Sequence, residues 1–161
     1  MYHGKEITTL KIIDVSKVEI HPITLEAAID VASNLRPEDR REAEEGHGWD
    51  LMEYAELIAQ EGTAVYFTMP NGKTAGMAGV GDDGQIWMVC TPVIEKYPHS
   101  FARGSKRFVE SRTAPLLWNI VDRRNTVHLK LLRFLGFKFL REFRYGPNNL
   151  LFIEFCRVFT R

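Results

Sequence analysis

The run Asn125-Thr-Val-His-Leu-Lys-Leu-Leu-Arg-Phe-Leu-Gly-Phe137 decides how this chain is expected to fold. Asn125 can cap the start of a helix, and Gly136 can adopt the left-handed conformation that ends one. The apolar run at 116–121 predicts a buried strand before this helix, and residues 137–141 predict another strand after it. The stretch therefore predicts a strand-helix-strand unit.

Upstream of this unit the chain alternates between strand-like and helix-like segments. Short β-prone runs at 8–14 and 18–21 come first, and helices are predicted to begin after Thr24 and Asp50, with a charged turn at 38–45 between them. Further strands are predicted at 63–69, 74–81 and 85–91, joined by turns at 70–73 and 82–84. Because no linker or repeat interrupts the pattern, we expect a single α/β domain spanning residues 1–161.

The composition restricts the class of protein. The 161 residues are 45% hydrophobic, which is enough for a substantial core, and no apolar run approaches the ~20 residues of a membrane-spanning helix. The first residues lack the apolar core of a signal peptide, so we expect no export and no membrane partner. Cys90 and Cys156 fall on separate predicted strands, and a content of two cysteines fits a reducing cytoplasm. The sequence does not decide whether they form a disulfide.

The net charge of zero hides an asymmetry between the two halves of the chain. Residues 1–95 hold 7 Lys/Arg and 17 Asp/Glu, whereas residues 96–161 hold 14 and 4, so the halves carry −10 and +10. The simpler interpretation is that these are solvated faces of one domain whose halves attract each other. The functional interpretation is that the basic half binds a polyanion, either a phosphorylated cofactor or a nucleic acid.

The unit from Asn125 to Phe137 resembles the last helix of the GNAT N-acetyltransferase superfamily, in which an Asn opens the helix and a Gly-Phe pair closes it. A wider region, 85–139, is similar to the GNAT-like family of tailed-phage proteins that includes the small internal virion protein of short-tailed coliphages. The residues that carry this similarity are Ile86–Thr91, Phe101–Phe108, Leu117–Asn119 and Asn125–Gly136.

The resemblance implies a single-domain GNAT-like fold, also called the acyl-CoA N-acyltransferase fold, with a mixed curved sheet flanked by helices. Strands 85–91 and 116–121 are then expected to be parallel neighbours that splay apart, so that backbone amides can meet a thioester. A crossover through a helix containing residues 106–110 would join them.

The resemblance also implies acetyl-CoA as the cofactor, with its pyrophosphate on a glycine-rich loop at a helix N-terminus. The nearest match is His99–Gly104, where Ala102 replaces the usual glycine and His99 the usual Gln or Arg. A plain helix start with a basic solvated face is the alternative. The expected cofactor contacts are Val89, Cys90, Thr91, Ala102, Arg103, Gly104, Ser105, Lys106 and Asn125.

Catalysis by this family needs a proton donor and a base, and the sequence departs from the pattern at the donor. The family commonly has a Tyr seven residues after the Asn, and Leu132 stands there. His128 is the nearest candidate donor, with a packed helix residue as the alternative. Glu42, Glu44 and Glu45 lie near the expected acceptor site, and we select Glu45 as the candidate base; a solvated acidic face is the alternative. No metal site is predicted.

The leading functional hypothesis is therefore acetyl-CoA-dependent acetylation of an amine on a protein or small molecule. The alternative is a non-catalytic phage protein that uses the fold for virion assembly or for binding a host partner. The resemblance implies a location in the host-cell cytoplasm, or in the virion. Nucleic-acid binding by the basic half is a third class, not favoured because the chain lacks a known module with interleaved exposed aromatic residues.

Overall fold

The computed structural model of the chain describes residues 17–160. Its strands are β1 (Glu19–Pro22), β2 (Val65–Thr68), β3 (Thr74–Val80), β4 (Ile86–Cys90), β5 (Leu116–Asp122), β6 (Lys138–Tyr145) and β7 (Leu150–Val158). Its helices are α2 (Leu25–Ser33), α3 (Pro37–Arg41), α4 (Leu51–Glu61), α5 (Pro98–Ser111) and α6 (Thr126–Phe134), with a π-helical turn η1 (Glu42–His47) and a 3-10 turn η2 (Pro92–Lys96). The strand predicted at 8–14 lies outside the described residues. The other predicted elements are present within a few residues of their expected positions.

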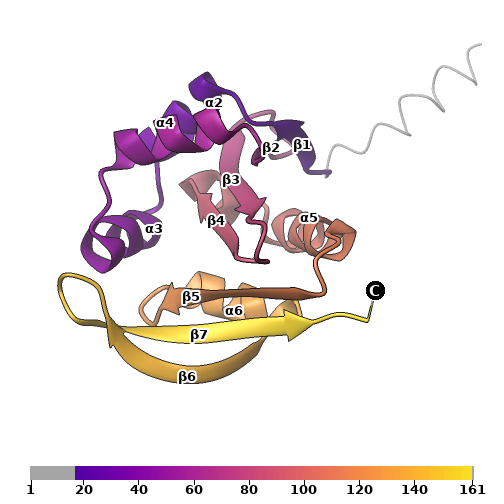
Figure 1. Ribbon diagram of the computed structural model, residues 1–161. Coiled ribbons are helices and arrows are strands. Elements are labelled where there is room, and N and C mark those ends of the chain that lie inside the picture. Colours follow the sequence, from indigo (N-terminus) through magenta and orange to yellow (C-terminus); the bar gives the residue numbers. More distant parts are fainter. Residues whose placement is uncertain (1–16, 161) are drawn as a thin grey trace, which may run out of the picture.

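The strands form two antiparallel sheets rather than one. The first has the order β1-β2-β3-β4 and the second the order β5-β7-β6. Figure 1 shows α2 and α4 together above the first sheet, with β5, β6 and β7 below it. The sheets are joined where Gln85 and Trp118 form a parallel bridge at the start of β4 and β5.

The expected fold class is confirmed, with one difference in the sheet. The parallel direction of β4 and β5 is confirmed at the bridge, where Trp118 N–H donates to Gly84 O at 3.1 Å. Instead of continuing as one mixed sheet, the strands then enter separate sheets. At this point a side chain replaces a backbone hydrogen bond between the two strands. The Asn119 side-chain amide donates to Ile86 O at 2.6 Å, where a backbone N–H of a parallel neighbour would otherwise donate. The splay is therefore built into the strand edges.

Helix boundaries follow local sequence signals at most ends. Thr24 Oγ1 accepts a hydrogen bond from Ala27 N–H at 3.1 Å, and Asp50 Oδ1 accepts from two N–H groups of the first turn of α4. Gly136 has φ +84°, so the predicted left-handed stop is confirmed. Asn125 is the N-cap residue of α6, as predicted, and its C=O accepts from Leu129 N–H at 3.1 Å, but its side chain makes no capping bond. The amide is instead used in a tertiary contact, described below.

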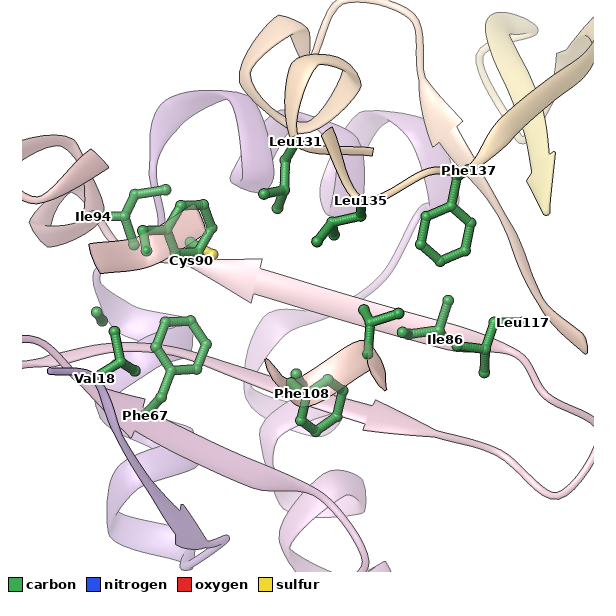
Figure 2. Close-up of a cluster of buried hydrophobic side chains, with 14 of the residues drawn as sticks. Val18, Phe67, Ile86, Cys90, Ile94, Phe108, Leu117, Leu131, Leu135 and Phe137 are labelled. Atoms are coloured by element: carbon green, nitrogen blue, oxygen red, sulfur yellow. The ribbon is translucent and has the colours of Figure 1, made fainter. Parts of the chain in front are cut away.

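Two apolar clusters stabilise opposite sides of the four-stranded sheet. The smaller one packs α2 and α4 against the sheet and includes Val31, Ala55 and Met77. The larger one joins both sheets to α5 and α6, and Figure 2 shows Phe108 of α5 and Leu131 of α6 among its members. The bridge-end residues of β4 and β5 therefore meet in a shared core. Among residues 17–160, no helix is both long enough and apolar enough to span a bilayer.

Candidate active site

A cavity of about 460 Å³ lies where β4 and β5 separate. Met88 lines it and packs with the larger core, whereas Trp87 and Val89 line it and pack with the smaller core. Consecutive side chains of a strand point to opposite faces of its sheet. A space that touches all three residues therefore passes around the free edge of β4, from the side of α5 and α6 to the side of α4 and η1.

The backbone of β4 offers one open position to this cavity. Thr91 N–H donates to Ala75 O of the β3 side at 2.9 Å, so the odd-numbered residues of β4 face β3 and the even-numbered ones face β5. At Cys90 this outer N–H donates to Asp39 Oδ2 at 2.9 Å. Met88 lies in the middle of the outer edge, at the cavity. Its N–H and C=O are the backbone groups best placed to meet a bound molecule.

The facing edge of β5 is held by Asn119. Its Oδ1 accepts from Ile120 N–H at 2.7 Å and from Gln85 Nε2 at 3.3 Å, while its Nδ2 donates to Ile86 O. One side-chain amide thus satisfies backbone groups of both strands at the narrow end of the splay. Gln85, Ile86 and Asn119 themselves line the cavity, so it reaches this end of the splay.

Glu42 of η1 brings a carboxyl group to the cavity. Its Oε1 accepts from Asp122 N–H at 3.0 Å and from Asn125 Nδ2 at 3.4 Å. Burial, assisted by the negative charge of Asp39, raises the pKa of Glu42 from 4.5 to about 8, and the two hydrogen bonds oppose this only in part. A carboxyl group with such a pKa can exchange protons with a substrate near neutral pH.

A buried polar network closes the wide end of the splay. Arg36 is fully buried; its N–H donates to Cys90 O at 2.9 Å and its Nη1 lies 3.3 Å from Asp39 Oδ1. Asn125 Nδ2 donates to the same Asp39 oxygen at 2.8 Å, and His128 Nε2 lies 3.4 Å from it. The network ties α3 to β4 and α6, which explains why the Asn125 side chain makes no capping bond to α6.

Three members of the network are residue types that bind metals. The side-chain ligand atoms of Asp39, Cys90 and His128 all lie within 4.8 Å of one another. Burial raises the pKa of the Cys90 thiol and lowers the pKa of His128, so both groups are held neutral, while Arg36 already pairs with the carboxylate. We interpret this group as a support for the strand ends. The sequence did not indicate it, since Asp39, Cys90 and His128 lie far apart along the chain.

The two predicted catalytic residues have different surroundings. His128 is buried and lines the cavity, as does Leu132 one turn later, so both lie on the cavity side of α6. Glu45 is exposed, and its Oε1 pairs with Arg124 Nη1 at 3.2 Å, an ion pair between the acidic and basic halves. Glu42, three residues before Glu45, is the one that meets the cavity. The π-helical turn separates them: Glu42 is half-buried and lines the cavity, while Glu44 and Glu45 are exposed.

The residues expected to form a pyrophosphate loop are helical. Residues 99–104 lie within α5, which begins at Pro98, so the expectation of a loop here is wrong. Gly104 is buried against Val18, the residue before β1: an added Cβ would lie 2.9 Å from Val18 Cγ2, so close packing explains this glycine. Ser105 lines the cavity, while Arg103 and Lys106 are exposed on α5 and Ala102 is half-buried.

Of the strand residues expected at the cofactor, Val89 lines the cavity. Cys90 and Thr91 are buried beside it, and Thr91 Oγ1 caps η2 by accepting from Val93 N–H at 3.3 Å. Asn125 is buried in the network and reaches the cavity only through its contact with Glu42. Of the residues expected at the cofactor, Val89, Gly104 and Ser105 thus line the cavity, whereas Met88, whose backbone faces it, was not among them.

No protein-family model matches the sequence, and no curated protein is similar to it. Solved structures do match over most of its length. A GNAT-family acetyltransferase from Bacillus anthracis aligns over 91% of this chain and 97% of its own, with a TM-score of 0.67 and 8% identity. The ribosomal-protein-S18-alanine N-acetyltransferase from Escherichia coli aligns over 89% and 95%, with a TM-score of 0.62 and 18% identity.

The Salmonella typhimurium protein yncA, solved with its cofactor acetyl-CoA, aligns over 91% of this chain and 96% of its own, with a TM-score of 0.55 and 13% identity. The chain therefore has the fold of GNAT acetyltransferases. At these identities the likeness concerns the fold alone. The comparisons give no support to the narrower phage family expected from the sequence.

Proposed function

We propose that this chain is an acetyl-CoA-dependent N-acetyltransferase that acts on an amine. The observation that carries the proposal is the cavity of about 460 Å³ that passes between β4 and β5 and is lined by Glu42. A fold shared with yncA, solved with acetyl-CoA, supports the choice of cofactor. No lining residue within 17–160 is a Lys or Arg, so an amine can enter without meeting a like charge.

In the proposed complex the thioester lies along the outer edge of β4. Met88 N–H would hold the carbonyl oxygen, and Val89 and Ser105 would line the pantetheine arm, since all three residues border the cavity. The exposed cations Arg103 and Lys106 of α5 would meet the phosphates outside it. This arrangement uses the helix that follows β4 without requiring a glycine-rich loop.

The chemistry needs one proton to leave the amine and one to reach the sulfur. Glu42 would take a proton from the ammonium form of the acceptor, since its pKa of about 8 lies close to neutral pH. The freed nitrogen attacks the carbonyl carbon, and Met88 N–H stabilises the charge that forms on oxygen. The nitrogen then carries one more proton to lose, and His128 on the cavity wall is the candidate group to take it and to donate one to the thiolate as the carbon–sulfur bond breaks, so that the imidazole is neutral before and after the step.

Coenzyme A binding tests the proposal before any acceptor is known. Millimolar coenzyme A should raise the melting temperature by mass action. Arg103→Glu should remove the increase, while Lys138→Glu, on an exposed side chain of β6 in the outer strand of the second sheet, makes the same charge change and should leave it intact. Absence of a shift in the wild-type protein would rule out the enzyme. Where the shift occurs, acetyl transfer to a panel of amines should fall by roughly 10²–10⁴-fold in Glu42→Gln.

A non-catalytic role, in virion assembly or in binding a host partner, is the second candidate. Leu132 favours it, because it stands on the cavity side of α6 where the family commonly has a proton-donating Tyr. Phage origin rests on the sequence resemblance alone. The coenzyme A experiment separates the two candidates, since a retained scaffold has no reason to bind the cofactor.

A further inference from the structure

One end of the cavity is walled by aromatic side chains that the proposed chemistry does not use. They come from three parts of the chain, residues 47–54, β4 and the end of β6, and all line the cavity: His47, Trp49, Tyr54, Trp87 and Tyr145. His47, Trp49 and Tyr54 form a stacked column, with ring centroids 4.1 Å apart for the first pair and 4.6 Å for the second.

Two further rings complete the wall at right angles to the column. Trp87 meets Tyr54 edge-on with centroids 5.9 Å apart, and Tyr145 meets His47 edge-on at 5.3 Å, where its hydroxyl lies 3.0 Å from His47 Nδ1. The rings support one another and therefore form a rigid surface. Rigid aromatic surfaces bind flat apolar groups through edge-to-face and offset contacts.

Carboxyl groups rather than cations line this end of the cavity. Glu42 and Glu61 line the cavity, and the described lining residues include no Lys or Arg. Burial raises the pKa of Tyr54, and the charges of Glu42 and Glu61 raise it further, so the two carboxyl groups lie close to the aromatic wall. Burial lowers the pKa of His47 to about 4, so this imidazole adds no positive charge at neutral pH.

We infer that the acceptor is a small arylalkylamine, a primary amine joined by a short aliphatic link to an aromatic ring. The inference rests on the proposed function and specifies the substrate of the same cavity. The ring would lie against Trp49, Tyr54 and Trp87, with the amine toward Glu42. An ammonium group beside Glu42 favours the ionised carboxylate, which prepares the base for its task. Anionic ring compounds are disfavoured by the carboxylates, and polyamines by the apolar wall.

Trp49 is the wall residue most open to solvent, with 40% of its surface exposed, so it lies at the mouth of the cavity. Trp87 is half-buried on β4. The remaining tryptophan, Trp118, lies on β5, does not line the cavity and donates from Nε1 to Asp83 O at 3.1 Å. The fluorescence of Trp49 and Trp87 should therefore change when an aromatic ring binds, whereas that of Trp118 should not.

The experiment is a fluorescence titration of the full chain, without coenzyme A, using phenethylamine, hexylamine and phenylpropionate. Phenethylamine should bind about tenfold or more tightly than hexylamine, which lacks the ring, and than phenylpropionate, which carries the opposite charge. Trp49→Ala should weaken phenethylamine binding about tenfold, whereas Trp118→Phe should leave it unchanged. Equal binding of hexylamine, tighter binding of phenylpropionate, or unchanged binding in a folded Trp49→Ala protein would each overturn the inference.

Acetylation of the same compounds separates this inference from the function on which it rests. Selective phenethylamine binding without acetyl transfer would support the aromatic site and contradict the proposed enzyme. Transfer to hexylamine as efficient as transfer to phenethylamine would support the enzyme and overturn the aromatic site.

Discussion

Replacing Glu42 by Gln should change how the stability of the protein depends on pH. Below pH 4.5 the carboxyl group is protonated in both the folded and the unfolded chain. Between pH 4.5 and about 8 the unfolded chain loses this proton, whereas the folded chain keeps it because burial raises the pKa of Glu42. The folded state then binds more protons, so its stability falls as the pH rises through this window and levels off above it.

The size of the effect follows from the two pKa values. Each pH unit of the window costs about 1.4 kcal/mol, so the folded state loses roughly 5 kcal/mol by the time Glu42 ionises at about pH 8. Glutamine has nearly the same shape, and its carbonyl oxygen can still accept from Asp122 N–H and Asn125 Nδ2. The variant should therefore match the wild type at low pH and exceed its stability increasingly as the pH rises.

Urea denaturation at about pH 5 and about pH 8.5 measures the difference, with the midpoint converted through the slope of each transition. Glu45→Gln is the matched control, because it makes the same chemical change three residues later on an exposed side chain. Its pH dependence should follow that of the wild type. If Glu42→Gln and wild type lose the same stability between the two pH values, the carboxyl of Glu42 is not held protonated and its assignment as the base fails.

Three other outcomes are expected. The rate of acetyl transfer at low substrate concentration should rise through about pH 8 as Glu42 of the free protein loses its proton, and a profile flat from pH 6 to 9 would contradict this. Leu132→Tyr should increase the turnover number by up to ~10²-fold, the usual gain from a general acid, because residue 132 lines the cavity. Slower turnover together with lower stability would mean that the new hydroxyl finds no hydrogen-bond partner there. Gly104→Ala should lower the free energy of unfolding by roughly 1–3 kcal/mol through the clash with Val18, measured by urea denaturation; an unchanged stability together with lost coenzyme A binding would instead assign this glycine to the cofactor.

The sequence by itself determined the order of the elements and most of their ends. The cap at Thr24 and the stop at Gly136 each depend only on atoms a few residues away in the sequence. They therefore do not depend on the tertiary structure around them. The alternation of strands and helices was predictable for the same reason, since side-chain periodicity is a local property. The resemblance then supplied the fold, including the separation of the fourth and fifth strands.

Only the tertiary structure decided which residues meet in the site. Asn125 had the local signature of a cap, yet its amide binds Asp39 from α3, because a buried carboxylate is costly to leave without donors. Glu42 and Glu45 belong to the same acidic run of the sequence, but only Glu42 lines the cavity, where it is half-buried, whereas Glu45 is exposed. Burial and electrostatic environment depend on segments that approach from far along the chain, so the pKa that makes Glu42 a candidate base exists only in the folded protein.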